Sequence, residues 1–135
     1  MNARTALVVL VALAAVQAAG CGSSQSADDA SAVAARFQAA LARGDGAGAC
    51  AQLSDQTRSK LEQQEQGRCD RAILELDLPE GGAVQTARVY VTSASVALAR
   101  GGAIFLDEAA DGWEISAAGC RPTGDDLPYD CELEG

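Results

Sequence analysis

Apolar residues have the spacing of a helix in the first half of the chain and the spacing of strands in the second half. Val33, Phe37 and Leu41 recur every four positions and share one face of a predicted helix. Ser31, or the Asp pair at 28–29, can cap the start of that helix. Shorter helices are predicted over 47–53, 56–66 and 69–76.

Alternating patterns predict strands over 84–91, 93–99, 103–107 and 113–117. In the third of these segments Ile104 and Leu106 face one side and Phe105 faces the other. The tail 121–130 shows no periodicity and is expected to be a loop. Helices followed by a series of strands predict an α+β domain, with N-terminal helices packed on one face of a four-stranded antiparallel sheet.

Residues 1–20 have the pattern of a signal peptide. Arg4 supplies the positive start, and the apolar run 6–16 is too short for a helix that crosses about 30 Å of hydrocarbon. Small residues at 18–20 precede Cys21, and this segment resembles the lipobox of bacterial lipoproteins. Two other interpretations stay open, a plain secretory signal that leaves Cys21 as a free thiol and a retained membrane helix.

Cys21 is the expected lipidation site. The chain has five cysteines, so a lipid on Cys21 leaves an even number for disulfides. Residues 21–29 are small and polar and predict a flexible tether, followed by a single domain over 30–135. Several acyl chains on one cysteine give durable attachment. The predicted location is the outer face of the cytoplasmic membrane, with the lipid bilayer as the partner of acylated Cys21.

The remaining cysteines allow three pairings, of which the sequence favours Cys50–Cys69 and Cys120–Cys131 because each closes a short loop. A disulfide that closes a loop of this size stabilises a domain by about 3 kcal/mol in the chain-entropy model. The first bond would join two helical segments, and the second would close the tail 121–130. A zinc or redox site is the alternative, but the Cys-x-x-Cys spacing that favours such sites is absent from the sequence.

The charge and composition of the chain narrow its possible functions. It has 19 acidic and 10 basic residues and a net charge of −9, which disfavours binding to nucleic acid. It has no histidine, which is the commonest general base and transition-metal ligand. We therefore expect no catalytic constellation, no metal site and no cofactor. A weak calcium site is the alternative for the acidic residues of the tail, which lack EF-hand spacing: Asp125, Asp126, Asp130, Glu132 and Glu134.

Short motifs across residues 30–131 resemble the NTF2-like (SnoaL-type, DUF4878-like) domains of small actinobacterial lipoproteins. The most distinctive stretch contains Trp113, Ala-Ala-Gly-Cys at 117–120 and Pro-Tyr-Asp-Cys at 128–131. Further matches lie at 36–41, 44–45, 49–50, 57–58, 61–62, 69, 105–106 and 121–122. The resemblance implies a cone-shaped fold, in which helices pack against a curved antiparallel sheet and leave a pocket between them. It implies no particular activity, because a fold alone does not determine function.

Four residues are candidates for that pocket: Phe37, Tyr90, Asp107 and Trp113. The leading hypothesis is a non-enzymatic binding or accessory domain of the cell envelope, whose partner is an unknown envelope protein or a small ligand. The alternative is a small-molecule enzyme of the NTF2-like cyclase or isomerase type, with Asp107 and Tyr90 as the acid–base pair. A third hypothesis is a structural spacer whose cone is filled by Phe37, Trp113 and Ile115.

Overall fold

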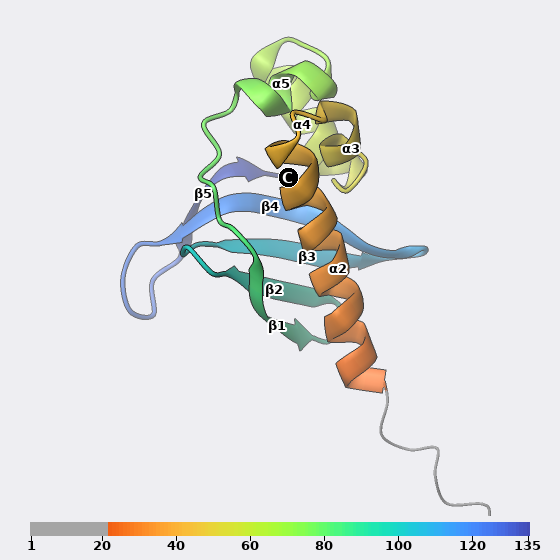
Figure 1. Cartoon of the computed structure of the whole chain (residues 1–135), viewed down its shortest axis with the longest axis vertical. Helices are drawn as coiled ribbons and strands as arrows, with labels where there is room; N and C mark the ends of the chain where they lie inside the picture. The colour runs from red at the N-terminus through yellow and green to blue at the C-terminus, as the bar shows by residue number, and fades with distance from the viewer. Residues whose placement is uncertain (1–21) are drawn as a thin grey trace, which may run out of the picture.

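The computed structural model describes residues 22–135, so the predicted signal peptide and Cys21 lie outside the described residues. Helices come first in the chain and antiparallel strands follow, which confirms the predicted α+β class (Figure 1). The helices are α2 (Gly22–Ala42), α3 (Gly46–Cys50), α4 (Asp55–Glu65) and α5 (Cys69–Glu75). The strands are β1 (Val84–Tyr90), β2 (Ser93–Leu98), β3 (Ala103–Ala109), β4 (Gly112–Pro122) and β5 (Tyr129–Glu134).

Helix α2 begins at Gly22, earlier than the caps at 28–31 predict. The segment 22–29, for which the sequence predicts a flexible tether, therefore belongs to the helix. The first buried apolar side chains described on α2 are Ala30 and Val33, so contact with the main core begins at that point of the helix. Among residues 22–135 no helix is both long and apolar enough to cross a membrane.

The sheet has five strands in the order β1-β2-β3-β4-β5, where the sequence predicts four. The additional strand is β5. It starts within the segment 121–130, which was expected to be a loop, and continues to Glu134. It pairs with an extended β4, and Cys131 lies directly opposite Cys120 in the ladder. Leu133 of β5 is only 1% exposed, so burial of this side chain holds the acidic tail against the sheet.

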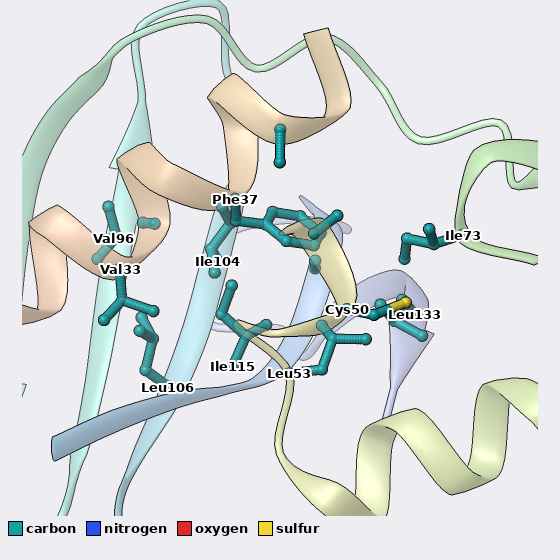
Figure 2. Close-up of a cluster of buried hydrophobic side chains, with 14 of the residues drawn as sticks. Val33, Phe37, Cys50, Leu53, Ile73, Val96, Ile104, Leu106, Ile115 and Leu133 are labelled. Atoms are coloured by element: carbon teal, nitrogen blue, oxygen red, sulfur yellow. The ribbon is translucent and has the colours of Figure 1, made fainter. Parts of the chain in front are cut away.

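Helix α2 lies across one face of the sheet, and α3, α4 and α5 gather at one end of the molecule beside β5 (Figure 1). The main core forms between α2 and this face of the sheet. Phe37 of α2 is fully buried there and is grouped with Ile104 and Ile115 (Figure 2). The alternation in β3 predicted this arrangement, because Ile104 and Leu106 both face the helix.

Phe105 belongs to a second, smaller cluster that contains no helix residue. Its ring packs edge-on against Tyr129, with 5.1 Å between the ring centroids. Ala103, Ala117 and Cys120 are the buried members of this cluster. The Cys120–Cys131 disulfide lies beside them and links β4 to β5, which is the second of the two predicted bonds.

The Cys50–Cys69 disulfide joins the end of α3 to the start of α5, as the sequence predicts. Gly46 at the start of α3 is buried against the backbone of Asp70, and a Cβ atom at this position would collide with the Asp70 carbonyl. The two short helices therefore pack at a distance that only glycine permits. This bond and this close contact hold the cluster of short helices together.

Candidate functional site

A surface groove of about 470 Å³ lies between the N-terminal half of α2 and the β3–β4 hairpin. We call it the α2–hairpin groove. Helix α2 contributes residues three and four positions apart, which therefore lie on one face of the helix. The lining residues are Gln25, Ser26, Asp29, Ala32, Val33 and Arg36 from α2, and Glu108, Asp111, Gly112 and Trp113 from the hairpin.

The geometry of the hairpin places Trp113 in this groove. The two-residue turn Ala110-Asp111 pairs Glu108 directly with Trp113, so these two side chains lie on the same face of the sheet. Gly112 has a φ of 128°, a backbone conformation that other residues rarely adopt. Trp113 is half-buried and packs against the main core, so its indole is supported from below and reachable from the groove.

The charged side chains of the groove are mainly acidic. Asp29 comes from α2, and Glu108 and Asp111 come from the β3–β4 hairpin. None of the three takes part in the salt bridges formed within residues 22–135. Arg36 is the only cation in the lining, and its Nε donates a 3.1 Å hydrogen bond to Oε1 of Gln52. The groove therefore offers unpaired carboxylates next to an aromatic ring.

The four pocket residues predicted from the sequence do not lie in one pocket. Phe37 is fully buried in the core, and Trp113 lies in the α2–hairpin groove. Tyr90 is 54% exposed, and Asp107 is also exposed. Both flank Ser93 in the strand ladder, on the face of the sheet opposite the main core. Strand alternation is the reason, because Asp107 follows the core residue Leu106 and must face the other way.

The interior of the fold is filled. Between α2, the loop before β1 and the sheet, the remaining gap measures about 10 Å³, which is the space of one water molecule at most. Its lining includes Phe37, Leu41 and Leu98. The internal pocket that the resemblance implies is thus reduced to this gap, and the accessible space lies on the surface.

A second, more open surface cavity of about 620 Å³ lies beside the Cys50–Cys69 disulfide. Arg68 and Asp70 at its rim form a two-bonded ion pair, with both N–O distances at 3.1 Å. The hydrogen bond from Arg68 lowers the pKa of Asp70, and the same bond raises the pKa of Arg68. These side chains neutralise each other, so the cavity offers less free charge than the α2–hairpin groove.

The sequence analysis missed Asp29, Arg36, Glu108 and Asp111 as groove residues. The turn falls on Ala110-Asp111, one residue before the hairpin signal Asp111-Gly112. A two-residue loop at that signal would have paired Ala110, rather than Glu108, with Trp113. The approach of α2 to this hairpin depends on packing between distant segments, for which the sequence has no local signal. Within residues 22–135, no group of three or more His, Cys, Asp or Glu side chains is arranged to hold a metal ion.

The chain was compared with protein-family models, with curated proteins and with solved structures, and none of them matches it.

Proposed function

We propose that the chain is a lipoprotein of the cell envelope whose domain acts by binding rather than by catalysis. In this proposal the signal peptide 1–20 is removed, Cys21 carries the lipid, and the domain is held at the outer face of the cytoplasmic membrane. The leader sequence and the small residues before Cys21 support this location. Two disulfides are compatible with an oxidising compartment outside the cytoplasm.

The binding role rests on the α2–hairpin groove. Its volume of about 470 Å³ lies within the range of roughly 300–1,000 Å³ that is usual for ligand sites. The half-buried indole of Trp113 provides an apolar contact surface, and the charged groups around it can orient a ligand. The groove is lined by α2, whose described part starts at Gly22, so the proposed anchor at Cys21 and the proposed binding site are close together in the chain.

A relationship to the NTF2-like lipoprotein domains is part of this proposal. The helices packed against an antiparallel sheet support it, as do the C-terminal motifs around Trp113 and Cys131. The filled interior means that a ligand would bind at the surface groove rather than inside a cone. The enzyme hypothesis gains no support, because Tyr90 and Asp107 are exposed side chains and line none of the three cavities described above.

The anchor is tested by comparing the wild type with Cys21→Ala, expressed in a bacterium that processes lipoproteins. The wild-type protein is expected in the detergent phase of a detergent partition, with acyl groups on Cys21 in its intact mass. The variant is expected in the aqueous phase. Wild-type protein without acyl mass, recovered from the aqueous phase, would overturn the proposed anchor.

The binding role is tested by photo-crosslinking in intact cells. A photoreactive amino acid replaces Ala32, which lines the groove. In the control protein it replaces Gln85 on β1, which is exposed and is not among the lining residues. Discrete adducts are expected from position 32 and not from position 85, and mass spectrometry would identify them. Equal labelling from both positions, or none from position 32, would contradict a binding role for the groove.

A further inference from the structure

We infer that the α2–hairpin groove binds an organic ammonium group, carried either by a free amine or by a lipid headgroup. The inference rests on the proposed binding function and adds the chemical class of the ligand. It starts from the combination of a cavity, an aromatic ring supported by the core and unpaired carboxylates from α2 and from the β3–β4 hairpin. These features occur together at no other cavity of residues 22–135 that we describe.

The lining of the groove carries more negative than positive side chains. Asp29 on α2, Glu108 on β3 and Asp111 in the turn all border the same groove, and Arg36 is the only positive side chain among the lining residues. No lysine or arginine neutralises these carboxylates through a salt bridge within the described part of the chain. The groove therefore attracts cations, and the net charge of −9 on the whole chain strengthens that attraction.

The lining of the groove favours an organic cation over a metal ion. The side chain of Trp113 offers no metal ligand, but an indole ring attracts ammonium groups through its negative face. Ala32 and Val33 add apolar contact area for the carbon atoms attached to the nitrogen. The lining thus matches a cation that carries methyl or methylene groups, such as a primary or quaternary amine.

Arg36 sets a limit on the ligand. Its Nε donates a hydrogen bond to Gln52, which restrains the guanidinium. Arg36 lies seven residues from Asp29 along α2. Seven residues of helix correspond to a rise of about 10 Å. A ligand with its ammonium group near Asp29 can therefore avoid Arg36, whereas an anionic ligand would meet the three carboxylates.

The position of α2 allows two sources of the amine. The rise from Gly22 to Asp29 is also about 10 Å, so a lipid on Cys21 would hold the groove close to the bilayer surface. Both a dissolved amine and a lipid headgroup could then reach it. Their shared chemistry is the ammonium group.

The test uses the fluorescence of Trp113, which is the single tryptophan of the chain and lies in the groove. The processed protein in a nonionic detergent is titrated with choline and with 3,3-dimethyl-1-butanol, which has the same shape without the charge. A saturable change is expected with choline, at an affinity at least about tenfold higher than for the neutral alcohol. Equal affinity for the two compounds, or no response to choline, would overturn the inference.

Matched variants locate the site. The groove variant carries Asp29→Asn, Glu108→Gln and Asp111→Asn, and the control carries Asp125→Asn, Asp126→Asn and Asp130→Asn in and beside the exposed β4–β5 loop. The two variants lose the same charge, so a general effect of net charge cancels between them. The groove variant is expected to bind choline at least about tenfold more weakly than the control. If the groove variant does not fold, the single substitution Glu108→Gln replaces it. A folded groove variant that binds choline as tightly as the control contradicts the inference.

Vesicles distinguish the two sources of the amine. The anchored protein is reconstituted in vesicles of phosphatidylcholine or of phosphatidylglycerol, and choline is then added. Reduced choline affinity in phosphatidylcholine assigns the groove to lipid headgroups, and equal affinity in both assigns it to dissolved amines. If the protein binds choline in neither kind of vesicle, the inference is overturned. Adducts at position 32 would in that case still support the broader binding role.

Discussion

The hydroxyl of Thr57 donates a hydrogen bond of 3.1 Å to the main-chain carbonyl of Ser116, and this bond joins α4 to β4. The same carbonyl accepts a 2.8 Å bond from the amide of Gly135. Because Thr57 donates to Ser116, its oxygen must accept the proton of Ser54, whose own oxygen accepts from the Thr57 amide. Among the described residues Thr57 is the only fully buried polar side chain, so these partners compensate for its burial.

Replacing Thr57 by valine is expected to lower the free energy of unfolding by about 1 kcal/mol, since it removes the hydroxyl and keeps the shape. Urea denaturation of the wild type and the variant measures this difference. Thr86→Val on the exposed side of β1 is the control and should change the stability by less than about 0.5 kcal/mol. Equal stabilities of Thr57→Val and wild type would show that the bond to Ser116 contributes nothing.

Gly46→Ala is expected to destabilise the domain by about 1–3 kcal/mol, because the new Cβ would collide with the Asp70 carbonyl and push α3 away from α5. Gly67→Ala is the matched control. At Gly67 the added atom would meet the Glu65 carbonyl at 3.6 Å, which is an ordinary contact. Thermal unfolding of both variants gives the comparison, and equal melting temperatures would contradict the close packing of the two helices.

Removing the Cys50–Cys69 bond by the double substitution Cys50→Ala and Cys69→Ala is expected to cost about 3 kcal/mol. The cause in the chain-entropy model is the greater freedom of the unfolded chain. The same two proteins measured in a reducing buffer form the control, because neither then contains this bond. The difference in the urea midpoint should shrink under reducing conditions, and a difference that persists unchanged would come from packing instead.

Asp70→Asn is expected to lower stability at neutral pH and to have no effect in strong acid. The bond from Arg68 lowers the pKa of Asp70 below the value of 3.8 that applies to an unperturbed Asp. The charged carboxylate therefore stabilises the folded state above pH 3.8, and this contribution is lost as the pH falls through the lowered pKa. Melting temperatures from pH 7 to pH 2 should converge for the two proteins. Asp125→Asn, which removes a carboxylate outside the salt bridges of residues 22–135, is the control for the loss of one charge and is measured at the same pH values.

Much of the fold could be predicted from local pattern. The four-residue spacing of Val33, Phe37 and Leu41 identified the buried face of α2, and the alternation around Phe105 identified the two faces of β3. The missed strand β5 also alternates, with Tyr129, Cys131 and Leu133 between acidic residues. Acidic residues are rare in strands, which hid this pattern, but an edge strand tolerates them because water covers one side.

The candidate site was harder to predict than the fold. Trp113 was identified as a pocket residue, yet its neighbours in the groove were not. The partner of Trp113 across the hairpin depends on a turn that falls one residue before the Asp111-Gly112 signal. Asp29 reaches the groove only because α2 packs across the sheet. Contacts between segments about eighty residues apart have no local signature in a single sequence.

Each disulfide joins two residues of the same half of the chain. Cys50–Cys69 lies among the helices, and Cys120–Cys131 lies in the sheet. Neither bond crosses the connection 77–83, so no covalent link other than the backbone joins the described helices to the strands. A protease site introduced near Asp77 should therefore yield two fragments that separate on a non-reducing gel in denaturant. Without denaturant the fragments should remain associated, held by Phe37 in the core and by the bond from Thr57 to Ser116. The two parts could then be produced separately and recombined, each already containing its own crosslink.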